Sequence, residues 1–168
     1  MRSGFVNRHL ARGFTGPPGP YVQCLLRARE QELAALMDEG VPRPCLVQAM
    51  EGADWSDWRW PELREPAAPC HASPDVEVLT RRLLCAVALE GVRCLDDGTV
   101  GSAAEADVGS IVGAGYPRWT GGVLSYVETV GLAPFVAEAQ ALAQSYGARY
   151  APPPSLVERA CTGRGFYR

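Results

Sequence analysis

Apolar side chains recur every three or four residues along most of this chain, which is the spacing of one face of an α-helix. The clearest example begins at Leu79 and ends near Leu95. The apolar positions in that stretch are Leu79, Leu83, Leu84, Val87, Ala88, Gly91 and Leu95. Asp96, Asp97 and Gly98 follow, and Gly98 stands where a left-handed residue commonly ends a helix.

The same spacing predicts the other helices. They are expected over residues 22–39, 44–50, 102–112, 123–130, 132–146 and 155–162. Alternating apolar and polar positions, the pattern of a half-buried strand, do not compete with the helical pattern in any segment. The sequence therefore predicts an all-α protein.

Polar residues at helix starts sharpen these boundaries. Ser102 with Glu105, and Ser155 with Glu158, form the S-x-x-E pattern of a capping box. Ser73, followed by a proline and two acidic residues within four positions, is predicted to cap the helix that contains Leu79.

Residues 30–50 resemble residues 88–108, which indicates a repeated helical unit. Between the two copies, residues 53–73 contain three prolines and lack sustained periodicity, so they are interpreted as a linker. The tryptophans in this segment, Trp55, Trp58 and Trp60, are expected to anchor it to a core. A site for an adenine ring or an acyl chain is the alternative for them.

Several motifs carry a family resemblance. They are EGVRCLDDG at 90–98, AEAD at 104–107, GYPRWTGG at 115–122, YVETVG at 126–131 and GFY at 165–167. In this order they resemble the C-terminal helical domain of 3-hydroxyacyl-CoA dehydrogenases. The similarity is greatest to the last repeat of the multifunctional alpha subunits of fatty-acid oxidation complexes. The resemblance implies two helical repeats: a degenerate first repeat over 1–52, the linker over 53–73, and the complete domain over 74–168.

The amino-acid composition and net charge of the chain limit the kinds of molecule that it is expected to bind. The chain has 168 residues, 47% of them hydrophobic and 21% charged, and its net charge is −3. Nothing in this balance favours binding to nucleic acid or to an anionic membrane. The first residues lack the apolar run of a signal peptide, and the six cysteines include no C-x-x-C pair. We expect a cytoplasmic protein with free thiols.

Hydride transfer needs a dinucleotide cradle and a base for the substrate hydroxyl. The glycine-rich stretch at 109–115 follows a helical pattern rather than a strand, so it is interpreted as a helix end. His9 and His71 match no family motif, and the adjacent Cys70 and His71 lack further ligands at suitable spacing. We therefore predict no catalytic, cofactor-binding or metal-binding residue in this chain. The resemblance assigns NAD to the complete family enzyme.

One substrate-binding residue follows from the resemblance. GFVNR at 4–8 is similar to the family's entry into this domain, although it is one residue shorter, and it places Asn7 where the family contacts the substrate. A local cap or an exposed side chain is the alternative for Asn7. Arg81, Arg82 and Arg118 would either contact a CoA phosphate or lie on solvated surfaces.

The resemblance implies the helical portion of an NAD-dependent 3-hydroxyacyl-CoA dehydrogenase of fatty-acid β-oxidation. Without the nucleotide-binding domain this portion is expected to be inactive alone. It would act with a separate nucleotide-binding (Rossmann) protein, or it is a truncated product of a larger gene. The alternative is a non-catalytic module that binds acyl-CoA or forms a homodimer.

Overall fold

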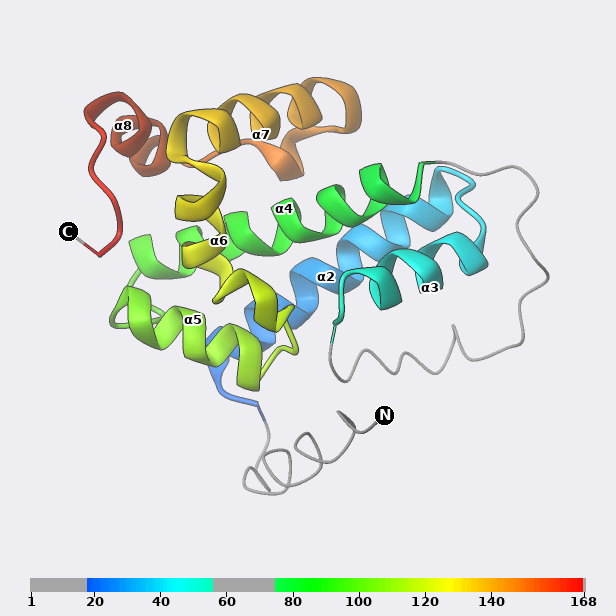
Figure 1. Cartoon of the computed structure of the whole chain (residues 1–168), viewed down its shortest axis with the longest axis horizontal. Coiled ribbons are helices and arrows are strands. Elements are labelled where there is room, and N and C mark those ends of the chain that lie inside the picture. Colours follow the sequence, from blue (N-terminus) through cyan, green and yellow to red (C-terminus); the bar gives the residue numbers. More distant parts are fainter. Residues whose placement is uncertain (1–17, 56–74, 168) are drawn as a thin grey trace.

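The computed structural model describes residues 18–55 and 75–167. These residues form helices and no strand, which confirms the predicted all-α class (Figure 1). The helices are α2 (Pro20–Asp38), α3 (Arg43–Gly52), α4 (Val76–Asp96), α5 (Ala103–Val112), α6 (Val123–Val130), α7 (Leu132–Tyr146) and α8 (Pro154–Thr162). Two short 3₁₀ turns, η2 (Arg118–Thr120) and η3 (Ala148–Tyr150), connect them.

Helix α4 is the central element of the fold. It runs beside α2 and also packs against α3, α5, α6 and η3 (Figure 1). Gly91 allows α6 to approach α4 closely, because a Cβ atom there would lie only 2.6 Å from a methyl carbon of Val123. Close to the same glycine, the hydroxyl of Tyr21 donates to the carbonyl of Ala106 at 2.9 Å and ties α2 to α5. One hydrophobic core therefore includes helices from both sides of the predicted linker.

The predicted helix ends agree with the structure where a glycine with positive φ follows the helix, as after α4 and α7. Gly98 adopts a φ of +77° directly after the end of α4, as its position predicted. Helices α6 and α7 occupy the predicted ranges, and α7 ends at Gly147 with a φ of +105°.

Two of the predicted caps are wrong. Helix α4 is capped by Asp75, whose side chain accepts from the Glu77 N–H at 3.0 Å, and not by Ser73. Ser155 lies inside α8, which begins after Pro153, and its hydroxyl donates to the carboxylate of Asp96 instead of capping the helix. Three consecutive prolines, Pro152 to Pro154, fix the start of α8, and its N-cap is Pro153, two residues before the predicted cap Ser155.

The cap at Ser102 is confirmed, with one change. The Ser102 hydroxyl accepts from the Glu105 N–H at 3.3 Å. The Glu105 carboxylate reaches back to the N–H of Gly101 at 3.2 Å, one residue before the position that a standard capping box uses.

Two helix pairs have parallel layouts. Helix α2 has 19 residues and α4 has 21, each is followed by a glycine with positive φ (Gly40 and Gly98), and α3 and α5 have 10 residues each. This layout is what a duplicated unit would produce. The duplication and the domain boundaries at 52 and 73 stay predictions.

Candidate functional site

A buried ion pair joins α2 to α4. The Arg82 side chain on α4 is only 3% exposed, and that of Glu32 on α2 is fully buried. Arg82 donates to Glu32 through Nε at 3.2 Å and to both carboxylate oxygens of Glu39 at 2.7 and 2.8 Å. The ring of Tyr146 lies 3.8 Å from the guanidinium carbon and covers its face.

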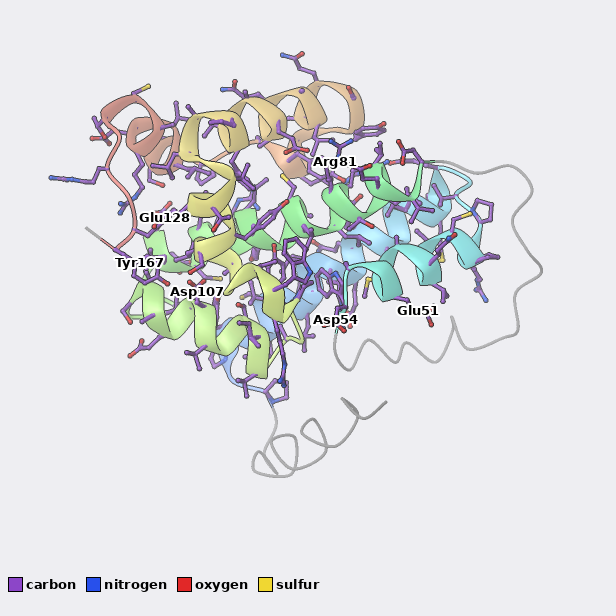
Figure 2. The ribbon with its side chains drawn as sticks, viewed as in Figure 1. Glu51, Asp54, Arg81, Asp107, Glu128 and Tyr167 are labelled. Atoms are coloured by element: carbon purple, nitrogen blue, oxygen red, sulfur yellow. The ribbon has the colours of Figure 1, made fainter. Side chains whose placement is uncertain are left out.

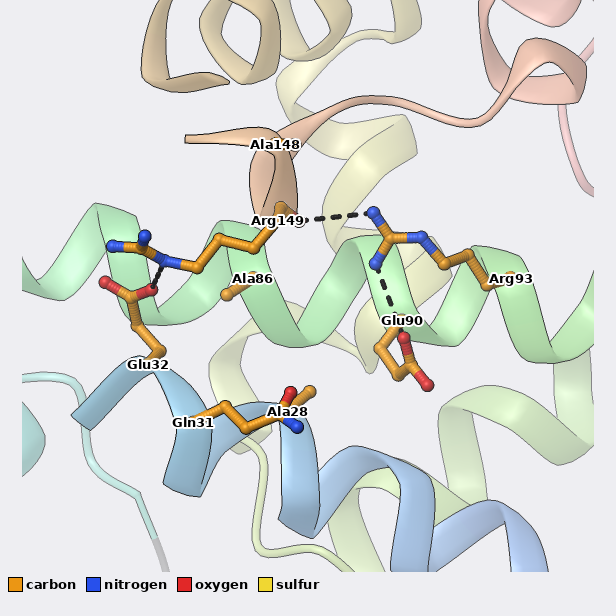
Figure 3. A pocket seen from close by; sticks show the side chains of 8 residues that line it. All are labelled: Ala28, Gln31, Glu32, Ala86, Glu90, Arg93, Ala148 and Arg149. Carbon is orange, nitrogen blue, oxygen red and sulfur yellow. Dashed lines mark hydrogen bonds and ion pairs between the residues drawn. The ribbon is translucent and has the colours of Figure 1, made fainter. Parts of the chain in front are cut away.

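The turn η3 completes this group, which we call the Arg82 cluster: Glu32, Glu39, Arg82, Arg149 and Tyr150. Arg149 donates through Nε to the second carboxylate oxygen of Glu32 at 2.7 Å (Figure 3). The Tyr150 hydroxyl accepts from Arg82 at 2.9 Å and donates to Glu32. Two carboxylates therefore balance two guanidinium groups. Glu32 and Arg82 are buried, whereas the side chains of Glu39 and Arg149 are about one-third exposed.

The contacts of the cluster shift the pKa values of Glu39, Arg82 and Tyr150. Hydrogen bonds from Arg82 hold the pKa of Glu39 below its ordinary value. Burial opposes the charge on Arg82, but the hydrogen bonds with Glu39 and Tyr150 outweigh it and raise the pKa of Arg82. Burial also raises the pKa of Tyr150, and its bond to Glu32 raises it further.

A pocket of about 360 Å³ opens beside the cluster, between α2, α4 and η3 (Figure 3). Glu32 and Arg149 form one end of it, and Glu90 and Arg93 form the other. Arg93 donates to the Glu90 carboxylate at 3.3 Å and to the carbonyl of Arg149 at 3.2 Å. Both arginines are neutralised by neighbouring carboxylates, so this pocket does not provide the unpaired positive charge that a CoA phosphate would favour.

Three motifs of the family resemblance meet at a second group, the Asp107 cap (Asp107, Gly122, Leu124, Ser125 and Tyr167), in which Asp107 is buried and Tyr167 is exposed. The Asp107 carboxylate accepts from the backbone N–H of Leu124 at 2.7 Å and of Ser125 at 3.1 Å, at the start of α6. The hydroxyls of Ser125 and Tyr167 donate to it as well, and Figure 2 shows Tyr167 beside Asp107. A carboxylate in this place stabilises the positive end of the helix dipole.

Gly122 permits this approach. Its φ is +118°, and a Cβ atom there would lie 2.4 Å from the Cβ of Asp107. The second glycine of GYPRWTGG therefore permits a close backbone approach, and the residue that requires it is the acidic residue of AEAD, Asp107.

The GYPRWTGG corner also has structural contacts. Tyr116 is fully buried and donates to the carbonyl of Leu84 at 3.1 Å, and the Trp119 indole donates to the carbonyl of Ala53 at 2.9 Å. Trp55 packs edge-on against Tyr116 with ring centroids 5.3 Å apart, so it anchors its segment to the core as predicted. Arg118 is exposed.

A third group contains two thiols. Sequence reasoning did not bring together Cys24 on α2 with Glu90 and Cys94 on α4, and their ligand atoms all lie within 4.8 Å of one another. Cys94 is 1% exposed, and burial together with the neighbouring Cys24 raises its pKa to about 12. The cysteines that the structure describes form no disulfide, as predicted. The only sequence signal was the spacing of Glu90 and Cys94, four residues apart on one helix face.

Arg81 and Arg82, which the sequence analysis considered as CoA-phosphate contacts or solvated residues, differ in exposure in the structure. Arg81 lies at the surface near Glu138, at 3.9 Å. Arg82 is buried, so both interpretations of it, a solvated face and a phosphate contact, are wrong. Asn7 lies outside the described residues, and its role as a substrate-binding residue stays a prediction. His9, Trp58, Trp60, Cys70 and His71 lie outside them too.

Comparison with known proteins agrees with the resemblance. The fatty acid oxidation complex subunit alpha of Pseudomonas syringae pv. syringae (strain B728a) is 44% identical over 91 residues, which are 54% of this chain and 12% of the relative. The same subunit of Vibrio campbellii (strain ATCC BAA-1116) is 45% identical over 78 residues, 46% of this chain and 11% of the relative. The chain is homologous to fatty acid oxidation complex alpha subunits. No protein-family model matches it.

The extent of this homology is limited. About half of the chain matches, and the matched part spans about 12% of the alpha subunits, consistent with part of their C-terminal region. The names of these relatives refer to fatty acid oxidation. In the described residues of this alpha-subunit homologue, no helix has both the length and the apolar character needed to cross a membrane.

Proposed function

We propose that this chain is the helical C-terminal portion of an NAD-dependent 3-hydroxyacyl-CoA dehydrogenase of fatty-acid β-oxidation. The Asp107 cap is the observation that supports this proposal most directly. It joins AEAD, the paired glycines and the terminal GFY, three motifs through which the chain resembles that domain. Shared motifs that make one contact with each other indicate a shared fold, whereas isolated short motifs would not.

In this proposal the chain supplies structure and a second domain supplies the chemistry. A dinucleotide cradle requires a strand–turn–helix unit. The segments 18–55 and 75–167 contain helices but no such unit. The motif residues on these segments stabilise helices and turns. Catalysis would therefore require a nucleotide-binding domain that contributes NAD and the catalytic base, as the family resemblance implies.

Helix α5 and the turn after it offer a surface for this second domain. Val108 and Val112 on α5 and Trp119 in η2 are 63%, 52% and 62% exposed, which is high for large apolar side chains. The same surface supports the alternative function, a homodimerising module. The balanced charges of the pocket beside the Arg82 cluster give less support to an acyl-CoA-binding module.

Oxidation of NADH with acetoacetyl-CoA tests the proposal. The purified chain alone is expected to give no turnover. The alpha subunit of Pseudomonas aeruginosa is 44% identical to this chain over 91 residues. We expect that adding the nucleotide-binding domain of that subunit to the chain gives more turnover than the added domain gives alone. Turnover by the chain alone would refute the proposal. Failure of the mixture, together with a homodimer in light scattering, would favour the dimerising module.

A matched pair of variants locates the contact surface. The substitutions Val108→Glu and Val112→Glu place two charges on α5 and should abolish the added turnover. The control variant carries Ala137→Glu and Gln140→Glu, two charges on the exposed side of α7, and should retain it. Equal loss in both variants would show that the α5 surface is not the contact.

A further inference from the structure

The group formed by Cys24, Glu90 and Cys94 has the composition of a cation site. Its three ligand atoms, two Sγ and one carboxylate oxygen, lie within 4.8 Å of one another. Glu90 and Cys94 share one face of α4, and Cys24 faces them from α2, the helix that packs most extensively on α4. The two helices are held in this relation by the core and by the Arg82 cluster, so the three ligands are largely preorganised.

Small movements bring these atoms to bonding distances. Zinc binds thiolate sulfur at about 2.3 Å and carboxylate oxygen at about 2.1 Å, so two sulfur ligands in a tetrahedral site lie about 3.8 Å apart. The observed separations therefore need to contract by no more than about 1 Å. Rotation about the side-chain bonds of cysteine and glutamate supplies such a shift without moving either helix.

The ligand set selects the metal. Two thiolates with one carboxylate suit zinc, whereas magnesium and calcium prefer oxygen ligands alone. Copper(I) favours sites made entirely of soft ligands. Three protein ligands also leave a fourth tetrahedral position for water.

The surroundings meet two further requirements of a metal site. Arg93 donates to the carboxylate of Glu90 at 3.3 Å and to two backbone carbonyls, of Arg149 and Ala151, which fixes the orientation of the carboxylate. Glu90 also lines the pocket of about 360 Å³ (Figure 3), and this pocket gives an ion a route from solvent.

We propose that Cys24, Glu90 and Cys94 bind one zinc ion, which cross-links α2 to α4. This site departs from the sequence-based prediction of a chain without metal ligands. It is independent of the proposed dehydrogenase role, because none of its residues belongs to the Asp107 cap or to the α5 surface.

Cobalt(II) is a suitable probe, because thiolate ligands give it a strong near-ultraviolet charge-transfer band. The reduced full-length chain is titrated with cobalt and then with zinc. One cobalt per chain and loss of the band on addition of one equivalent of zinc are expected. Cys24→Ser and Cys94→Ser should each abolish the band, and Glu90→Gln should weaken zinc affinity at least about tenfold.

Cys161→Ser is the matched control, because Cys161 is exposed and lies outside the group, and this variant should bind as the wild type does. Thermal unfolding gives a second readout: zinc should raise the Tm of the wild-type chain and leave that of Cys24→Ser unchanged. Cys24 is only half-buried, so this variant is expected to fold. Full binding by Cys24→Ser, or a wild-type chain that binds no cobalt under reducing conditions, would overturn the proposal.

Discussion

Replacing Arg82 by alanine tests whether the Arg82 cluster holds the two halves of the fold together. The substitution removes the hydrogen bonds to both carboxylates and leaves Glu32, which is fully buried, with less positive charge beside it. Removing one partner of a buried pair typically costs about 3–5 kcal/mol. Arg149 and Tyr150 remain bound to Glu32, so we expect a loss near the lower limit, about 3 kcal/mol. Such a loss is a large share of the roughly 5–15 kcal/mol by which proteins are stable.

Urea unfolding followed by circular dichroism measures this loss as a change in the free energy of unfolding. Arg149→Ala is the matched control: it removes an arginine that is one-third exposed and should cost only about 1 kcal/mol. The double variant Arg82→Ala, Glu32→Gln should recover part of the loss, because no buried charge is then left without its partner. A loss below about 1 kcal/mol for Arg82→Ala, or strictly additive effects in the double variant, would refute the reasoning.

Two further predictions concern the caps and the acid stability of the fold. Gly122→Ala should destabilise the chain by about 3 kcal/mol in urea unfolding, since the new Cβ combines an unfavourable φ with a clash against Asp107. Gly98→Ala has positive φ but open space and should cost only about 1 kcal/mol; equal losses would contradict the role of the close approach. Hydrogen bonds from Arg82 lower the pKa of Glu39 in the folded state, so its contribution is complete above about pH 5 and is lost as the pH falls through that lowered pKa. Glu39→Gln should therefore flatten the fall in Tm between about pH 5 and pH 3, and an unchanged slope would count against the ion pair.

Helix positions were predictable because their signals are local. The apolar spacing and the glycine stops gave α6 and α7 their observed ranges, and the end of α4 at Gly98 followed from the same pattern. Caps were less predictable. Ser73 and Ser155 have suitable side chains, but the start of a helix also depends on how the chain enters it, and there Asp75 and Pro153 decide.

The candidate sites were harder to predict from the sequence than the helices, because their residues come from different helices. The contact between Gly122 and Asp107 could not be predicted from local patterns, because Asp107 comes from a different helix. The same limit applies to the thiol group, since Cys24 on α2 is far in sequence from Glu90 and Cys94. The substrate contact of Asn7 rests on the family resemblance and stays a prediction.

The sequence by itself determined the all-α class, most helix boundaries and the family resemblance, since each depends on residues a few positions apart. Tertiary structure alone decided which charges are buried. An arginine on a helix is usually solvated. Arg82 is buried because α2 and η3 cover it, and its partners Glu32 and Tyr150 are 118 positions apart. A contact between segments so distant in sequence forms only when the helices pack, so local patterns do not carry it.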